Sequence, residues 1–505
     1  MLRHLTAASV LAILIAGPAV AAPRPLSAAE IALLNRVSWG ASASSAADLA
    51  TMGSDRWLER QLHPSPADRL PAEAQQEIDA LAISHTPMAT LVQALNDQNK
   101  AANLITDPDQ KKVAQTAYQQ AMTDLARQAA TRKILRDLYS LDQLQEQMTW
   151  FWFNHFNVHE YKANLRAMVG DYEETAIRPH ALGRFRDLLE ATLRHPAMLR
   201  YLDNADNAAG HINENYAREI MELHTMGVGS GYTQKDVQEL ARILTGVGID
   251  ANPVDPHLNP AHAADFVRAG LFEFNPNRHD YGDKLFLGHT IHGAGFSEVE
   301  QALDILARQP ATATHISRQL AVYFVSDDPP QSLVDHMAQT FQRSDGDIAA
   351  VLRTMFHSPE FKASLGTRFK DPVHYSISAV RLAYDDKVIL STSPIQNWLN
   401  RLAEGLYNHE TPDGYPMTEA SWDGPGQMAV RFEIARQIGS GGAGLFKPDG
   451  PGAVDHPGFP TLQNALYYGG LSDTLGKPTL SALDQAASPQ EWNTLFLASP
   501  EFMRR

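Results

Sequence analysis

The residues best suited to chemistry lie in one short segment, residues 211–224, which reads HINENYAREIMELH. On an α-helix, with about 100° between successive residues, its side chains divide into an apolar half and a polar half. The polar half forms one unbroken stripe of Glu214, Arg218, His211, Glu222, Asn215 and Glu219. The stripe contains three carboxylates and no lysine, whereas an ordinary solvated face would normally contain lysine.

Crowded carboxylates push their pKa values apart, as acid–base or metal chemistry requires. Glu219 lies at the edge of the apolar half, so we expect a largely buried general acid with His155 or His279 beside it. Glu222 or Glu214 would then be the base or nucleophile. Arg218 and Asn215 would bind substrate. The alternative is a solvated face with i,i+4 ion pairs from Arg218 to Glu214 and Glu222.

A second cluster of polar residues directly follows an apolar run. Residues 150–153 are apolar on every side of a helix, which predicts a helix buried all round. Asn154, His155, Asn157 and His159 come next, and buried polar groups must find partners. His155 and His159 are spaced i,i+4, which on one helix face suits a metal ion. Asn154 and His155 are also candidate substrate-binding residues; the alternative is structural histidines with satisfied hydrogen bonds.

A third polar cluster lies in a segment without periodicity, from Phe272 to Lys284. Its density of polar residues and a turn near Gly282 suit a loop that lines a site. His279 and Asp280 are its candidate substrate-binding residues, and His279 is a third candidate metal ligand. The alternative is a well-capped surface turn.

Helical periodicity dominates the rest of the chain, and β-branched runs are few. The sequence predicts a mainly α, multi-helical globular body with short β-hairpin insertions. A first helix over 27–37 has Ser27 and Glu30 in a capping-box pattern, and residues 112–139 predict a long exposed helix. The expected strands are short, at residues 271–274, 284–287 and 387–390.

Composition excludes several classes of function. The chain has 505 residues, with 58 acidic against 42 basic side chains and a formal charge of −16. This charge argues against nucleic-acid binding, which needs clustered lysine and arginine. The absence of cysteine excludes disulfides, thiolate nucleophiles and zinc ribbons.

The first residues resemble an export signal. An apolar run over residues 5–16 is followed by the small-residue segment PAVAA at 18–22, which is typical of a secretory signal peptide with its cleavage site. We therefore expect a signal peptide at 1–21 and a periplasmic or secreted mature chain. No later stretch has the roughly 18 apolar residues of a membrane helix. Residues 22–505 are predicted to form one helical domain with N-terminal helices (22–140), a site region (141–295) and C-terminal helices (296–505).

Several sequence blocks occur together and in order across the mature chain. They include residues 34–40 (LNRVSWG), 152–156 (WFNHF), 213–223 (NENYAREIMEL), 358–361 (SPEF), 370–372 (KDP) and 414–416 (GYP) with Trp422. In this combination the chain resembles the bacterial family called domain of unknown function 1800. The resemblance implies an exported, mostly helical protein of no assigned activity. It also implies a co-encoded exported partner from the family called domain of unknown function 1501, which is akin to sulfatases and alkaline phosphatases.

Three functions are compatible with these observations. The first is an exported hydrolase that cleaves a polysaccharide, or another envelope or extracellular substrate, through the glutamate-rich stripe. The second is a metal-dependent enzyme or metal-binding envelope protein, in which a divalent ion would be held by His155, His159 or His279 together with the glutamates. The third is a non-enzymatic scaffold for the co-encoded partner, favoured by the long exposed helix.

Overall fold

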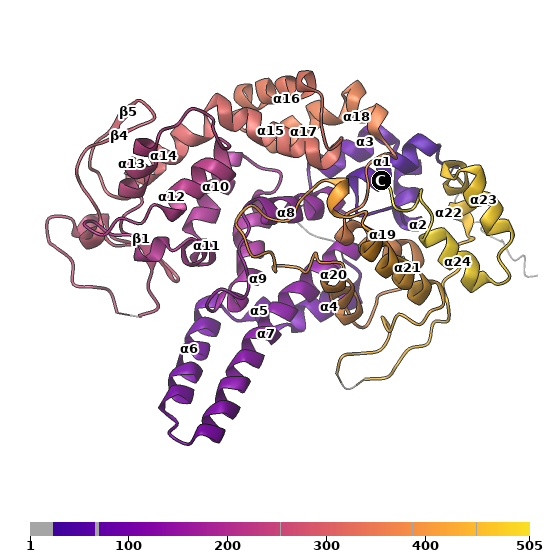
Figure 1. The fold of residues 1–505 in the computed structure, drawn as a ribbon, viewed down its shortest axis with the longest axis horizontal. Coiled ribbons are helices and arrows are strands. Elements are labelled where there is room, and N and C mark those ends of the chain that lie inside the picture. Colours follow the sequence, from indigo (N-terminus) through magenta and orange to yellow (C-terminus); the bar gives the residue numbers. More distant parts are fainter. Residues whose placement is uncertain (1–23, 66–69, 253, 386, 451) are drawn as a thin grey trace, which may run out of the picture.

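A computed structural model describes residues 24–65, 70–252, 254–385, 387–450 and 452–505 (Figure 1). Helices account for 60% and strands for 4% of this structure, which confirms a mainly α fold with short β insertions. The expected signal peptide, residues 1–21, lies outside the described residues.

Five helices open the described chain. They are α1 (Ala28–Val37), α2 (Ala43–Met52), α3 (Ser54–Leu62), α4 (Ala72–Ala80) and α5 (Ala82–His85). The predicted capping box at α1 is present, because Ser27 accepts from the Glu30 N–H and the Glu30 carboxylate accepts from the Ser27 N–H. This reciprocal pair satisfies N–H groups that have no partner within the helix.

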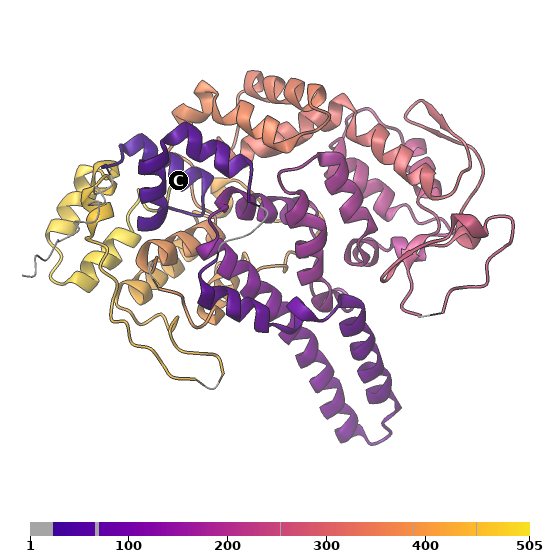
Figure 2. The same cartoon turned by 180° about the vertical axis from the view of Figure 1, so that it is seen from behind.

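Helices α6 (Met88–Leu104) and α7 (Pro108–Tyr139) pack against each other and form an arm that projects from the body in both views (Figures 1 and 2). The predicted exposure of α7 holds for its outer part only. From Met122 onward many of its side chains are buried, so the inner half of α7 belongs to the core.

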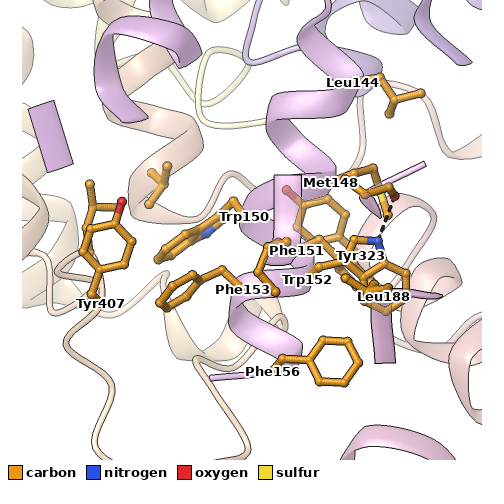
Figure 3. Close-up of a cluster of buried hydrophobic side chains, with 14 of the residues drawn as sticks. Leu144, Met148, Trp150, Phe151, Trp152, Phe153, Phe156, Leu188, Tyr323 and Tyr407 are labelled. Carbon is orange, nitrogen blue, oxygen red and sulfur yellow. Dashed lines mark hydrogen bonds between the residues drawn. The ribbon is translucent and has the colours of Figure 1, made fainter. Parts of the chain in front are cut away.

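Helix α8 (Gln143–His155) lies near the middle of the molecule, and its side chains leave it in several directions (Figure 3). The predicted all-round burial is confirmed, since residues 150–153 are each at most 3% exposed. The Phe153 ring lies 4.9 Å from that of Tyr407, and the Phe151 ring lies 5.3 Å from that of Tyr323. At roughly 2 kcal/mol per buried large apolar side chain, α8 contributes strongly to the core.

The region after α8 contains short helices and two π-helical turns. Its helices are α9 (Val169–Asp171), α10 (Phe185–Arg194), α11 (Pro196–Tyr201), α12 (Asn215–Glu219) and α13 (Gln234–Ile243), with π-helical turns at Tyr172–Ile177 and Ile220–Thr225. The predicted helix over 211–224 therefore begins only at Asn215. It also widens to π geometry at Ile220, so the regular 100° spacing fails in its second half.

Two small antiparallel sheets follow α13. The first has the order β1-β3-β2, and the second is the hairpin β4–β5. Their bounds are β1 (Val247–Ile249), β2 (Val267–Ala269), β3 (Phe272–Phe274), β4 (Lys284–Phe286) and β5 (His289–Ile291). Two of the three predicted strands match β3 and β4. The third, at 387–390, is wrong: no strand forms there, and the Leu390 and Ser391 N–H groups both donate to the Leu445 carbonyl.

The remaining helices complete the body (Figure 1). They are α14 (Phe296–Ala307), α15 (Pro310–Phe324), α16 (Gln331–Arg343), α17 (Ile348–Phe356), α18 (Pro359–Ser364), α19 (Pro372–Ala383), α20 (Ser393–Arg401), α21 (Pro425–Gly439), α22 (Ala465–Tyr468), α23 (Lys477–Asp484) and α24 (Pro489–Leu497). Helices α21 and α24 approach closely at Gly439, where a Cβ atom would lie 2.9 Å from the Thr494 nitrogen. Among the described helices, none has both the length and the apolar character to span a bilayer.

Candidate functional site

The polar stripe on α12 contains both of the ion pairs that its spacing allows. Arg218 contacts Glu214 at 3.2 Å and Glu222 at 3.4 Å. Glu219 differs from these two glutamates, because no hydrogen bond or ion pair to its carboxylate occurs among the described residues. It is half-buried rather than largely buried. Asn215, at the start of α12, donates a hydrogen bond to the Leu202 carbonyl at 3.1 Å, so its amide holds the helix start in place.

The environment of Glu219 favours its protonated form. Burial raises the pKa of Glu219, and the charges of Glu222 and Asp413 raise it further, while Arg218 opposes them. Glu219 therefore has the raised pKa that a general acid needs. Neither of the expected histidines is among the groups that shift its pKa. Asp413 takes that neighbouring position instead, and nothing in the local sequence around α12 pointed to it.

Two asparagines at the end of α8 bring Asp413 to this position. Asn154 accepts a hydrogen bond from the Tyr415 N–H at 2.6 Å and donates one to the Tyr415 carbonyl at 2.9 Å. Asn157 donates to two backbone carbonyls of the same segment, at 3.0 and 2.8 Å. Gly414 has φ +73°, and a Cβ atom there would lie 2.2 Å from the Asn154 carbonyl oxygen. Asn154, predicted to bind substrate, is thus occupied in positioning residues 409–415.

Two tyrosines, Tyr201 and Tyr232, lie near these carboxyl groups. Tyr201 is buried, its hydroxyl donates to the Glu410 carbonyl at 2.7 Å, and its pKa is raised by burial and by the charges of Asp413 and Glu219. Burial, followed by hydrogen bonding to Glu222, raises the pKa of Tyr232 to about 12. We call the set Arg218, Glu219, Glu222, Asp413, Tyr201 and Tyr232 the acidic site.

His155 lies against the backbone of the π-helical turn that follows α12. Its Nε2–H donates to the His224 carbonyl at 3.0 Å. His315, from α15, donates in the same way to the Leu223 carbonyl at 3.2 Å. Burial, with a smaller contribution from the charge of His315, lowers the pKa of His155 to about 3, so the ring is neutral. His155 thus acts as a cap for carbonyls at a helix end.

The predicted shared face of His155 and His159 does not form, because α8 ends at His155. His159 instead lies in the following turn, where its ring is 3.2 Å from the Asn408 side-chain oxygen. Among the described residues, no group of three or more histidine and carboxylate side chains is arranged to hold a metal ion.

His279 belongs to a separate buried triad. Its Nε2 lies 2.8 Å from Glu298, whose other oxygen contacts Lys284, and all three side chains are fully buried. The neighbouring Asp280 pairs with Arg242 of α13 at 2.8 Å. These contacts attach the β insertion to α13 and α14. In the described structure, neither His279 nor Asp280 contacts the acidic site through a hydrogen bond or ion pair.

A small enclosed cavity of about 20 Å³ contains a pair of carboxyl groups that sequence reasoning missed, Asp371 and Glu404. Asp371 accepts from the His374 N–H at 2.7 Å, and Glu404 accepts from the Val373 N–H at 3.0 Å. Both therefore cap the N-terminus of α19. Burial and then the Asp371 charge raise the pKa of Glu404 well above its usual value. A cavity of this size holds one or two waters, at roughly 10–15 Å³ each, so we assign the pair to helix capping.

A family model described as "Protein of unknown function (DUF1800)" matches residues 32–504. The chain belongs to this family. No curated protein and no solved structure matches this DUF1800 protein.

In this DUF1800 protein, three of the sequence blocks that carry the family resemblance meet in space. The block at the end of α8 contacts the block at residues 414–416 through Asn154 and Tyr415. The preceding Asp413 acts on Glu219, which belongs to the block at residues 213–223. The acidic site is therefore assembled from segments about 200 residues apart.

Proposed function

We propose that this DUF1800 protein is an exported hydrolase that cleaves a polysaccharide at the acidic site. The observation that carries the proposal is the state of Glu219, a half-buried carboxyl that has no hydrogen-bond or ion-pair partner within the described part of the chain. Its pKa is raised by burial and by Glu222 and Asp413. A raised pKa favours the protonated form of Glu219, which is the form that can transfer a proton to a leaving group. The nearby Glu222 is paired with Arg218 at 3.4 Å.

Glycoside hydrolysis needs only a pair of carboxyl groups, one that donates a proton and one that acts as base or nucleophile. Glu219 would protonate the glycosidic oxygen, and Glu222 would act as the base that activates water or as the nucleophile. Asp413 keeps the proton on Glu219 by repelling its ionised form. Asp413 is 64% exposed, and access of this kind suits an extended polymer better than a small enclosed substrate.

The test is a screen of the purified mature protein on a broad polysaccharide panel, with variants at three glutamates. Glu219→Gln and Glu222→Gln should each lower turnover by about 10²–10⁴, as for loss of a general acid or base. Glu214→Gln is the matched control, because Glu214 pairs with the same arginine at 3.2 Å but is not among the groups that shift the pKa of Glu219. Its turnover should stay near wild type. Turnover that survives Glu219→Gln would remove Glu219 from the acid role.

Export is part of this proposal and has its own test. The apolar run at residues 5–16 and the small-residue segment at 18–22 support cleavage after Ala21. Expression of the full chain in a Gram-negative host should give a periplasmic or secreted product whose N-terminal residue is Ala22. A full-length cytoplasmic product would contradict export.

A second candidate function, a scaffold for a co-encoded exported protein of the unknown-function-1501 family, is favoured by the arm. Near its tip, Leu104 of α6 is 82% exposed and Val113 of α7 is 71% exposed. Apolar side chains exposed this way suit a protein contact. The double variant Leu104→Ser/Val113→Ser should lose co-purification of that partner, whereas Gln120→Ser on the same helix should retain it. Equal amounts of co-purified partner with the double variant and with Gln120→Ser would contradict a contact at the tip of the arm.

A further inference from the structure

A polar pocket outside the acidic site lies between α7 and α20. Its volume is about 180 Å³. One side is formed by Ala126 and Ala130 of α7, together with Leu406. Glu160 and Tyr161, from the turns after α8, also line it.

Glu160 is the group that points to a ligand in this pocket. Its residue is only 9% exposed, yet no hydrogen bond or ion pair to its carboxyl occurs among the described residues. Only its backbone N–H is paired, donating to the Tyr407 carbonyl at 2.9 Å. Burial raises the pKa of Glu160 to about 7, against a smaller opposing effect of the Arg166 charge. The Glu160 carboxyl oxygens are not fully enclosed by protein, and the residue lines the pocket, so a ligand there can hydrogen-bond to them in place of water.

The charges around Glu160 select the class of ligand. Arg166 is held near Glu160 by a hydrogen bond to Thr123 at 2.9 Å, and Arg127 also lines the pocket. The guanidinium groups of Arg166 and Arg127 disfavour an ammonium group in the pocket, and the Glu160 carboxyl, once it is ionised, repels a second carboxylate. A neutral ligand with hydroxyl groups meets neither penalty, because a hydroxyl can donate to or accept from Glu160 in either protonation state.

The residues that line the pocket limit the shape of a ligand that can fit there. The methyl groups of Ala126 and Ala130, with Leu406 and the Tyr161 ring, offer apolar surface. The amides of Gln396 and Asn400 offer polar groups in the same pocket. An apolar face combined with a polar edge is the surface of a sugar ring. The volume lies below the roughly 300–1,000 Å³ of pockets for drug-sized ligands, which limits the occupant to one ring.

We propose that this pocket binds one neutral sugar ring of the polysaccharide substrate, with the Glu160 carboxyl as its central hydrogen-bonding group. The proposal rests on the proposed function for the identity of the substrate. It also connects to the acidic site through the chain, because Leu406 and Tyr407 of the pocket directly precede the segment that carries Asp413. The pocket would thus hold the chain on the protein while the acidic site acts on it.

The test is isothermal titration of the full mature chain with glucose, galactose, mannose, xylose and N-acetylglucosamine. Glucosamine and glucuronate serve as the cationic and anionic probes. At least one neutral sugar should bind, and more tightly than both charged sugars. Failure of every neutral sugar to bind, or tighter binding of a charged one, would overturn the proposal.

Substitutions in and beside the pocket test whether the sugar binds there. Asn400→Trp should fill the pocket from its rim and weaken binding by at least about tenfold; Asn400 is exposed and its side chain has no hydrogen bond in the described structure. Asn397→Trp is the matched control, since Asn397 is exposed on the same helix and does not line the pocket. Glu160→Leu should weaken binding similarly. Binding unchanged in Asn400→Trp would overturn the proposal.

The two proposals can fail separately. Glu219→Gln should abolish turnover but leave monosaccharide binding unchanged within about twofold. Binding that depends on Asn400 and Glu160 in a protein with no turnover would uphold the sugar pocket and remove the hydrolase. Turnover that depends on Glu219 in a protein that binds no monosaccharide would uphold the hydrolase and remove the sugar pocket.

Discussion

Glu298 at the start of α14 offers the sharpest test of how the β insertion is attached. Its carboxylate accepts hydrogen bonds from the His279 ring at 2.8 Å and from the Ala294 and Gly295 N–H groups at 2.7 and 3.2 Å. The other carboxylate oxygen contacts the Lys284 ammonium. Glu298→Gln keeps the size of the side chain but removes its charge, and it turns one acceptor into a donor.

The expected loss follows from the burial of this group. The side chains of Glu298, His279 and Lys284 are fully buried, so the substitution leaves the ammonium of Lys284 without a counter-charge. Removal of one partner from a buried ion pair costs about 3–5 kcal/mol. Against a typical unfolding free energy of about 5–15 kcal/mol, that is a large part of the stability of the fold.

Urea denaturation monitored by circular dichroism measures the free energy of unfolding directly. Glu300→Gln, an exposed site on the same helix, is the matched control and should change it by less than about 0.5 kcal/mol. Adding Lys284→Met to Glu298→Gln should restore part of the loss, because it removes the unpaired charge. A loss below about 1 kcal/mol for Glu298→Gln would refute the reasoning.

Three further predictions concern other parts of the structure. Asn154→Ala should lower stability by about 1–3 kcal/mol and speed hydrogen exchange at the Tyr415 amide; unchanged exchange would contradict its positioning role. His155→Phe should cost a similar amount in urea denaturation, because it leaves the buried His224 carbonyl without its hydrogen bond; a neutral effect would contradict the capping role. Burial acts to raise the pKa of Glu174, but ion pairs with arginines of α7 lower it to about 2. Its stabilisation is thus complete above the unfolded value of 4.5 and lost as pH falls toward 2. Glu174→Gln should therefore reduce the acid-induced loss of stability by about 3 kcal/mol; an unchanged acid titration curve would contradict this.

Features set by neighbours in the chain could be predicted from the sequence. The capping box of Ser27 and Glu30 is local chemistry, and it forms as expected. The all-round burial of residues 150–153 follows from their composition, since four large aromatic side chains in succession leave no polar face. By contrast, a strand at 387–390 needs a strand elsewhere in the chain to pair with, and the neighbouring segment at Leu445 offers only one carbonyl rather than a ladder of hydrogen bonds.

The geometry of the acidic site could be predicted only in part. The i,i+4 ion pairs of Arg218 follow from spacing and are present. The π-helical turn at Ile220–Thr225 contains no glycine or proline that could have signalled it in the sequence. Because a π-turn has more residues per turn than an α-helix, the side chains from Ile220 onward point in other directions than the regular helix predicts. The end of α8 at His155 likewise follows from packing, so the expected histidine pair does not share a face.

The residues that sequence reasoning missed lie far from the elements they act on. Asp413 lies nearly 200 residues from Glu219 along the chain. Glu160 lies more than 230 residues from α20, which lines the same pocket. A signal for Asp413 existed in the glycine and proline that follow it, at Gly414 and Pro416, because such residues predict a turn that can present a side chain. Glu160 had no such signal, since its importance depends on a pocket that forms only in the folded chain.

The central claim, that Glu219 holds a proton for catalysis, is tested most directly by titrating this one carboxyl group. Difference infrared spectra of wild type against Glu219→Gln, recorded across pH, isolate its carboxylate band. We predict that the pKa of Glu219 lies above that of an ordinary glutamate. It should fall toward the ordinary value in both Glu222→Gln and Asp413→Asn, because each substitution removes a charge that disfavours ionisation. A pKa at or below about 4.3, the ordinary glutamate value, or a raised pKa that neither substitution changes, would contradict it.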